Sequence, residues 1–174
     1  MTFKTQIIKS KKINGLLQIL PSSHKDQRGQ LYSFFDDDII KSILPKKRHF
    51  NHLKIAQTNT NSLRGIHGDF TSWKLVTCLH GNIFQVALDN RVNSTTYLNS
   101  EEFNLNSSKP SAILLPPGVG NGFYAFDDCV YGYSLSYNGE YNDFDQQFTI
   151  RWNDPKHKIK WPNIKPILSD RDKQ

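Results

Sequence analysis

A short stretch of the chain combines a histidine with two cationic side chains. Residues 59–74 read NTNSLRGIHGDFTSWK and contain Arg64, His67 and Lys74. An imidazole can remove a proton near neutral pH, and a neighbouring cation can stabilise the negative charge that results. Each residue taken singly is more often a structural or surface side chain. Their combination, followed by LLPPGVGNGF at residues 114–123, indicates acid-base chemistry.

The rest of the sequence is patterned mainly for short β-strands. Runs of apolar and alternating residues predict strands at residues 52–57, 73–79, 83–88, 112–115 and 131–137. The Gly81-Asn82 pair is typical of a hairpin turn, so we expect a meander of antiparallel strands. Residues 36–44 predict the one clear helix, because acidic residues precede an apolar stripe that ends at Pro45. This pattern predicts an all-β sandwich or barrel.

Composition narrows the classes of protein to consider. The chain has 174 residues, of which 37% are hydrophobic, so we expect one globular domain spanning residues 1–174. The net charge of +6 favours anionic partners. The short basic run at residues 46–48 has no interleaved aromatic residues, which argues against a nucleic-acid partner.

Targeting and cysteine patterns point to the cytoplasm. The N-terminal residues lack the apolar core of a signal peptide, and no run approaches the length of a membrane span. We therefore expect a cytoplasmic protein with no membrane partner. Cys78 and Cys129 are far apart without CxxC spacing, which argues against a disulfide framework and against a zinc site.

Six motifs in register resemble the dTDP-4-dehydrorhamnose 3,5-epimerase family. They are SLRGIH, KLVTCLHGNIFQVALDNR, LLPPGVGNGF, IRWNDP, IKWP and ILSDRD, and the resemblance covers residues 26–172. It implies a cupin-type jelly roll, usually a homodimer, that acts on nucleotide-linked 4-keto sugars without metal or organic cofactor. The fold class inferred from the strand pattern agrees with it.

The sequence also argues against the metal site of other cupins. Such a site uses two His two residues apart, a Glu several residues on and a third His after the PPG turn. The corresponding positions here are His67, Asp69, Lys74 and Asn121. A cation at the Glu position would repel a divalent metal, and one His cannot hold it, so we expect neither a metal nor a cofactor.

The resemblance assigns roles to individual residues. A ketone at C4 acidifies the protons on C3 and C5, and epimerisation needs a base, an oxyanion-stabilising cation and an acid on the opposite face of the ring. By resemblance, His67 is the base, Asp172 orients it, Lys74 stabilises the enolate and Tyr133 is the acid. The residues expected to bind substrate are Arg28 and Arg64 at the diphosphate, Gln57 and Asn59 beside the sugar and phosphates, and Asn121.

Several positions depart from the rhamnose-pathway pattern. His24 stands where that pattern has an aromatic residue, Ser33 where it has a glutamate, and Asn121 where PPGxxHGF has its histidine. Both His24 and Ser33 are expected near the nucleotide. The sequences RGIHGD, KLVTC, YNGEY and DQQFT resemble instead a branch that acts on GDP-linked 6-deoxy-4-keto-heptoses for capsule synthesis.

We therefore expect a 3- or 3,5-epimerase acting on such a GDP-heptose, in capsule or lipopolysaccharide precursor synthesis. One alternative is a dTDP-4-dehydrorhamnose 3,5-epimerase. Another is a jelly roll that binds a nucleotide sugar without catalysis. The sequence leaves open whether C3, C5 or both are inverted.

Overall fold

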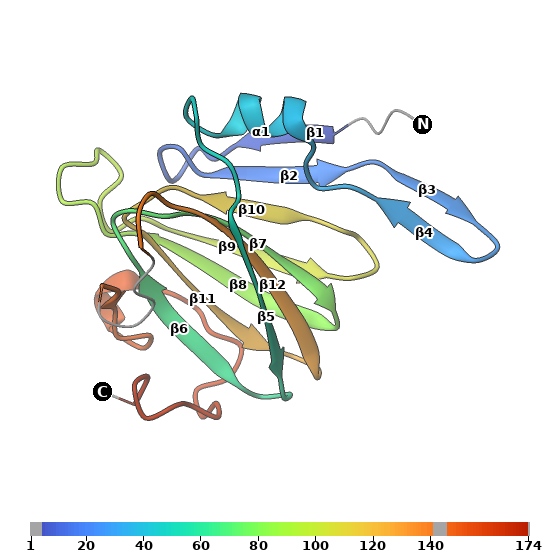
Figure 1. Ribbon diagram of the computed structural model, residues 1–174. Coiled ribbons are helices and arrows are strands. Elements are labelled where there is room, and N and C mark those ends of the chain that lie inside the picture. Colours follow the sequence, from blue (N-terminus) through green and yellow to red (C-terminus); the bar gives the residue numbers. More distant parts are fainter. Residues whose placement is uncertain (1–4, 141–145, 174) are drawn as a thin grey trace.

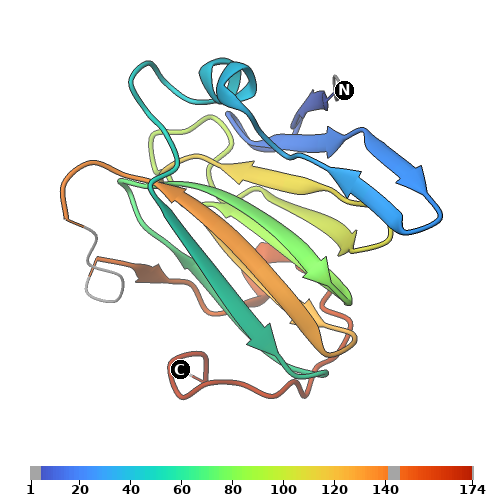
Figure 2. The ribbon, with the colours of Figure 1, turned by 45° about the vertical axis from the view of Figure 1, so that its right-hand side comes forward.

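The computed structural model describes residues 5–140 and 146–173, whose strands form two facing antiparallel sheets and a separate hairpin (Figures 1 and 2). The larger sheet contains, in spatial order, β1 (Thr5–Lys9), β2 (Leu17–Pro21), β10 (Ala112–Leu115), β7 (Trp73–His80), β12 (Cys129–Ser136) and β5 (His52–Thr58). The smaller sheet contains β13 (Phe148–Thr149), β6 (Leu63–Gly68), β11 (Val119–Ala125), β8 (Asn82–Asp89) and β9 (Ser100–Asn106). The hairpin consists of β3 (Ser23–Asp26) and β4 (Gly29–Tyr32). The predicted all-β class is confirmed.

The main core lies between the two sheets. Val76 and Ile113 come from the larger sheet, and Ile83 and Phe123 come from the smaller one; all four are at most 2% exposed. Because successive strand residues point to opposite faces, these side chains alternate with residues on the outer faces. Leu75, the neighbour of Val76, belongs to a second apolar cluster on the outer face of the larger sheet.

The predicted hairpin at Gly81 is wrong. The strands β7 and β8 follow each other in sequence, but β7 pairs with β10 and β12, whereas β8 pairs with β9 and β11. Gly81, at a φ of 81°, turns the chain from one sheet to the other. Five consecutive residues of β7, Lys74 to Cys78, are buried although they alternate between the two faces, so the buried run identifies a strand without identifying its partners. The sheets are therefore not a meander.

The predicted helix at residues 36–44 is confirmed as α1 (Asp37–Ile43). The Asp36 carboxylate caps it by accepting from the backbone N–H of Ile39 across 2.9 Å. The helix packs over the outer face of the larger sheet, where Ile43 and Leu44 belong to the same apolar cluster as Leu75. A short 3₁₀ turn, η1 (Pro155–His157), lies near the C-terminus.

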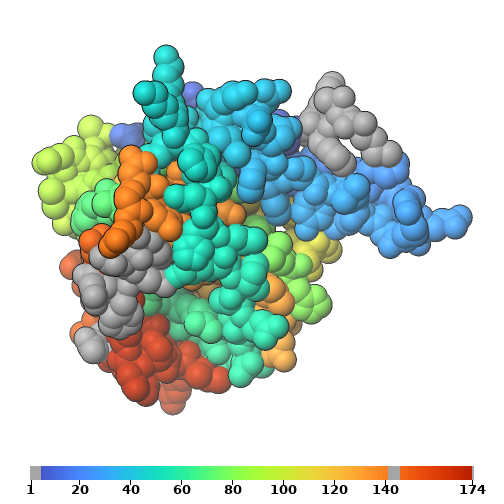
Figure 3. Space-filling view, viewed as in Figure 1, coloured from blue at the N-terminus to red at the C-terminus, as the bar shows by residue number. Residues whose placement is uncertain are grey.

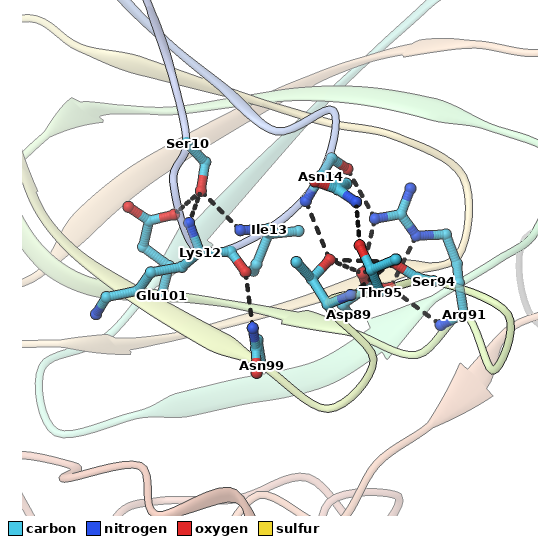
Figure 4. Close-up of polar contacts among 11 residues, drawn as sticks. Ser10, Lys12, Ile13, Asn14, Asp89, Arg91, Ser94, Thr95, Asn99 and Glu101 are labelled. Carbon is cyan, nitrogen blue, oxygen red and sulfur yellow. Dashed lines mark hydrogen bonds and ion pairs between the residues drawn. The ribbon is translucent and has the colours of Figure 1, made fainter.

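A buried carboxylate ties two loops to the end of β8 (Figure 4). Asp89 is fully buried and accepts from Arg91 Nε at 2.8 Å and Nη2 at 2.7 Å, and from the hydroxyls of Ser94 and Thr96 at 2.7 and 2.6 Å. Arg91 Nη2 also donates to the backbone carbonyl of Asn14 across 2.7 Å. Burial would raise the pKa of Asp89, but these hydrogen bonds lower it to about 2.

Candidate active site

A cavity of 480 Å³ lies between the sheets. The residues around it belong to β5, β7 and β12 of the larger sheet, to β6 and β11 of the smaller sheet and to the C-terminal segment. Of the residues singled out in the sequence, those that line the cavity are Gln57, Asn59, Arg64, His67, Lys74, Asn121, Tyr133 and Asp172. The fold thus brings together residues that are more than 100 positions apart.

His67 and Asp172 form a direct pair in this cavity. The distance from His67 Nε2 to Asp172 Oδ1 is 2.7 Å, and the Asp172 side chain is 3% exposed. The other carboxylate oxygen accepts from Ser169 Oγ at 2.8 Å and from the Gly65 N–H at 3.5 Å. Burial would raise the pKa of Asp172, but the hydrogen bonds from His67 and Ser169 hold it below its usual range. The ionised carboxylate favours a proton on Nε2, which leaves His67 Nδ1 with a free lone pair.

Backbone contacts fix the segment that carries Asp172. Leu63 N–H donates to the carbonyl of Ile167 across 2.9 Å, and Ile167 N–H donates to the carbonyl of Asn61 across 2.8 Å. Leu168 packs against the apolar cluster that includes Leu63 and Trp152. The segment is therefore docked beside β6, and Asp172 lies within it.

Lys74 is almost fully buried and is paired with Asp69. The Lys74 Nζ lies 2.9 Å from Asp69 Oδ2, and the two side chains are 7% and 4% exposed. Asp69 Oδ1 accepts from the backbone N–H groups of Thr71 and Ser72 at 2.9 and 2.6 Å. Burial alone would raise the pKa of Asp69, but Lys74 and these hydrogen bonds lower it. The turn between β6 and β7 thus holds the ammonium group at the cavity wall.

Tyr133 and Tyr131 share one face of β12 but lie in different surroundings. Both line the cavity, but Tyr133 is only partly buried, whereas Tyr131 is 3% exposed and stacks on Phe123. Burial raises the pKa of Tyr133, and the nearby Arg64 cation opposes that effect only in part. The phenol is therefore protonated at neutral pH and can donate a proton.

Two hydrogen-bond acceptors on β5 hold the Arg64 side chain in place. Its Nε donates to Thr58 Oγ1 across 2.9 Å, and its Nη2 donates to the Gln57 carbonyl across 3.2 Å. These bonds hold the guanidinium group at the cavity wall beside Asn59. A fixed guanidinium group is well suited to bind a diphosphate.

The sequence signature of "dTDP-4-dehydrorhamnose 3,5-epimerase" matches residues 10–174. The chain belongs to this family. It is 29% identical over 167 residues to the dTDP-4-dehydrorhamnose 3,5-epimerase of Escherichia coli, covering 93% of the chain and 89% of that protein. It is 31% identical over 165 residues to the dTDP-4-dehydrorhamnose 3-epimerase of Streptomyces niveus, covering 92% of the chain and 78% of that protein.

The fold of the chain is also similar to that of a solved epimerase structure. The dTDP-6-deoxy-D-glucose-3,5-epimerase of Legionella pneumophila, in complex with dTDP-4-keto-L-rhamnose, matches with a TM-score of 0.89 at 28% identity. The match covers 98% of the chain and 90% of that structure. The predicted jelly roll is therefore confirmed, and the chain is an isomerase of the nucleotide-sugar epimerase family.

Three residues expected near the nucleotide lie away from this cavity. His24 and Arg28 belong to the β3–β4 hairpin, which projects from the body of the molecule (Figure 3), and Ser33 follows it. The Arg28 side chain is 89% exposed, and its Nη2 lies 2.6 Å from Asp26 Oδ2. None of the three lines the cavity of its own chain. Within one chain the structure does not bring these three residues to the other site residues, because the hairpin extends away from the sheets; their expected place near the nucleotide stays a prediction.

Asp69 and Gln85 contact the cavity-lining residues Lys74 and Tyr131, and the motifs gave Asp69, Gln85 and Tyr131 no role in the site. Asp69 was considered only as a metal ligand, and neither Gln85 nor the buried hydroxyl of Tyr131 was expected to take part. The alternation in β12 places Tyr131 and Tyr133 on one face, and both line the cavity, but it does not show that the Tyr131 hydroxyl is bonded to Asn121 and Gln85. Gln85 gives no sequence signal, because a polar residue within an apolar strand shows its partner only in the folded structure.

Within residues 5–140 and 146–173, no three His, Cys, Asp or Glu side chains cluster as metal ligands would. Over the same residues, no helix has the length and apolarity needed to span a membrane. Positions 141 and 145, which belong to the YNGEY and DQQFT motifs, lie outside the described residues.

Proposed function

We propose that the protein inverts C3, C5 or both in a dTDP-linked 4-keto-6-deoxy sugar. The observation that carries the proposal is the paired His67 and Asp172 in the same cavity as Lys74 and Tyr133. The names of the relatives support the nucleotide, because they refer to dTDP-linked sugars. These relatives give no support to the expected GDP-linked heptose or to capsule synthesis.

The geometry supports a two-base mechanism through an enolate. His67 Nδ1 would take the proton from a carbon next to the C4 ketone, and the Asp172 carboxylate would stabilise the resulting imidazolium. The electron pair of the broken C–H bond would move onto the C4 oxygen, where Lys74 would stabilise its negative charge. Tyr133 would then protonate the same carbon from the other face and invert its configuration.

The strands that carry these groups support the stereochemistry. His67 lies on β6 of the smaller sheet, whereas Tyr133 lies on β12 of the larger sheet. A sugar ring held between the sheets would have one face toward each residue. Arg64 at the cavity wall would bind the diphosphate, with Gln57 and Asn59 beside it.

Incubation with dTDP-4-keto-6-deoxyglucose in deuterium oxide tests this proposal. We expect deuterium at each inverted carbon and a product of changed configuration. The Escherichia coli relative is named as a 3,5-epimerase and the Streptomyces relative as a 3-epimerase, so the positions of deuterium decide between these outcomes. Binding of the sugar nucleotide without any deuterium exchange would refute the proposed epimerase activity and favour a protein that only binds a nucleotide sugar.

The preferred nucleotide can be tested separately by thermal unfolding. A ligand at 100 times its dissociation constant should stabilise the protein by about 2.7 kcal/mol. We expect this stabilisation with dTDP and a much smaller one with GDP at the same concentration. The opposite order would restore the GDP-linked heptose as the better substrate.

We further propose that the protein is a homodimer. Leu53, Ile55 and Leu79 are 65%, 51% and 40% exposed. Leu79 and Ile55 meet at Gly132, where a Cβ would lie 2.9 Å from Leu79 Cδ1 and 3.5 Å from Ile55 Cδ1, and Leu53 lies two residues before Ile55 on β5. An apolar patch of this kind favours contact with a second copy. A second copy would also offer Arg28 a cavity other than that of its own chain.

Light scattering on purified protein tests this dimer. Ile55→Glu should produce monomers, because it puts a charge at the centre of the apolar patch. The matched control is Ile164→Glu, since Ile164 is 82% exposed in the C-terminal segment. A monomeric native protein, or an Ile55→Glu variant that stays dimeric, would refute this interface.

A further inference from the structure

Three polar side chains form a relay of hydrogen bonds from the cavity into the core. Asn121 Nδ2 donates to the Tyr131 hydroxyl across 3.1 Å, and that hydroxyl donates to Gln85 Oε1 across 2.9 Å. Gln85 is fully buried, whereas Asn121 lines the cavity. The Tyr131 ring stacks on Phe123 with the ring centroids 4.3 Å apart. One end of the relay is thus fixed in the core, and the other end faces the proposed substrate.

One backbone carbonyl sets the direction of every bond in this relay. Gln85 Nε2 donates to the Val86 carbonyl across 3.0 Å, and a carbonyl can only accept. Gln85 must therefore turn its amide oxygen toward Tyr131, whose hydroxyl uses its single proton there. Since Tyr131 can then only accept, Asn121 must offer its NH₂ group. The Asn121 carbonyl oxygen is left for the cavity.

The residue that carries this oxygen lies opposite the proposed base. Asn121 on β11 is the cross-strand partner of His67 on β6, and both side chains line the cavity. Directly opposed residues of an antiparallel pair lie on the same face of the sheet. An amide oxygen accepts a hydrogen bond but neither takes up nor releases a proton near neutral pH. Asn121 can therefore hold a donor on the substrate without competing with His67 or Tyr133 for the reacting proton.

We propose that Asn121 accepts a hydrogen bond from a sugar hydroxyl on or next to the carbon that His67 deprotonates, and that Tyr131 and Gln85 are positioning residues that fix its amide. This inference rests on the proposed epimerase function. A sugar without that hydroxyl leaves the Asn121 oxygen without its donor, so the site distinguishes 4-keto sugars by their hydroxyl pattern.

Kinetics of Tyr131→Phe in two backgrounds test whether Tyr131 acts through Asn121. In the native background the variant should lower kcat/KM for the 4-keto substrate roughly tenfold, the equivalent of one lost hydrogen bond. In an Asn121→Leu background it should cause no further loss. An equal loss in both backgrounds, or no loss in the native one, would overturn the proposal.

A matched control and a second variant separate orientation from packing. Tyr124→Phe also removes a buried hydroxyl, which donates to Asn61 Oδ1 at 2.6 Å away from the cavity, and it should leave kcat/KM unchanged. Gln85→Met frees the Tyr131 proton to point toward Asn121, which turns the Asn121 NH₂ group toward the cavity. It should therefore reproduce the tenfold loss although Tyr131 and Asn121 are both intact. Native kcat/KM in Gln85→Met would refute the orientation argument.

A spectroscopic measurement keeps this inference distinct from the proposed function. The Asn121 side-chain amide can be assigned by NMR as the resonance pair that is missing in Asn121→Leu. Its protons should exchange slowly with solvent in the native protein and in Tyr124→Phe, but rapidly in Tyr131→Phe. Unchanged exchange in Tyr131→Phe would overturn the relay. Slow native exchange together with no turnover of any 4-keto sugar would preserve the relay and refute the epimerase.

Discussion

Replacing Asp172 with asparagine tests how the proposed base is activated. Both oxygens of Asp172 act as acceptors, one toward His67 Nε2 at 2.7 Å and the other toward Ser169 Oγ at 2.8 Å and the Gly65 N–H. Asparagine has only one acceptor oxygen. If that oxygen faces His67, the new NH₂ group faces the Gly65 N–H, and two donors then meet without an acceptor. If it faces Gly65, the NH₂ group forces His67 to carry its proton on Nδ1, where it cannot act as a base.

The size of the effect follows from the burial of the pair. The Asp172 side chain is 3% exposed, so solvent screens its hydrogen bond to His67 very little. A hydrogen bond to a charged group contributes about 1.5–3 kcal/mol, which corresponds to a loss of roughly 10- to 150-fold in kcat. KM should change little, because the carboxylate contacts the base and is not expected to contact the nucleotide.

The assay compares kcat, KM and deuterium incorporation for Asp172→Asn and Asp170→Asn. Asp170 is two residues away, 97% exposed and paired only with the surface residue Lys173 among its described contacts, so its variant should match the native enzyme. Exchange and inversion should fall together in Asp172→Asn, since both need the base. A kcat within threefold of native would show that Asp172 does not activate His67.

Three further predictions concern the proposed acid and two buried titratable groups. Tyr133→Phe should retain exchange of substrate protons with deuterium but lose inversion; normal product configuration would remove Tyr133 from the mechanism. Asp89 has a pKa of about 2 in the folded protein, against 3.8 when unperturbed. Above pH 4 it therefore adds about 2 kcal/mol to the free energy of unfolding, and this stabilisation is lost as the pH falls toward 2. Between pH 7 and pH 3, urea unfolding should show a fall in the free energy of unfolding that is about 1 kcal/mol larger in the native protein than in Asp89→Asn, because a pKa of about 2 leaves the rest of the loss to lower pH. His157 is 5% exposed with no hydrogen-bond partner for either ring nitrogen among the described residues, and burial lowers its pKa below 6.5. The unfolded chain then binds a proton more readily, so stability should fall as the pH drops below 6.5, and a Tm that falls equally in His157→Leu would contradict this.

The positions of the elements could be predicted from the sequence, but their pairing could not. The helix at residues 36–44 and the strand at 52–57 nearly match α1 and β5, because capping and alternation are local properties of the chain. The partners of β7 depend on contacts with β10 and β12, which lie about 40 and 60 residues further along. A Gly-Asn pair is compatible both with a hairpin and with a crossing between sheets, so Gly81 alone cannot decide between them.

In the site, too, the sequence could predict individual residues but not how all of them are arranged in space. Motifs in register singled out His67, Lys74 and Tyr133, which the structure places around one cavity. They could not show that Arg28 lies outside the cavity of its own chain, because this depends on the direction of the hairpin. They also could not show the relay to Asn121, whose polarity is set by a backbone carbonyl that no side-chain pattern records.

The two-layer fold gives a physical reason why this site would invert a carbon and not merely exchange its proton. Facing sheets lie roughly 10 Å apart, which is enough for one sugar ring between them. His67 on the smaller sheet and Tyr133 on the larger sheet would then approach a bound ring from opposite faces. In the proposed mechanism, exchange would need only His67, Lys74 and solvent, whereas inversion would need a donor on the second sheet. Since Tyr131 is held in the core by its bonds to Asn121 and Gln85, Tyr133 is the β12 phenol available for that step.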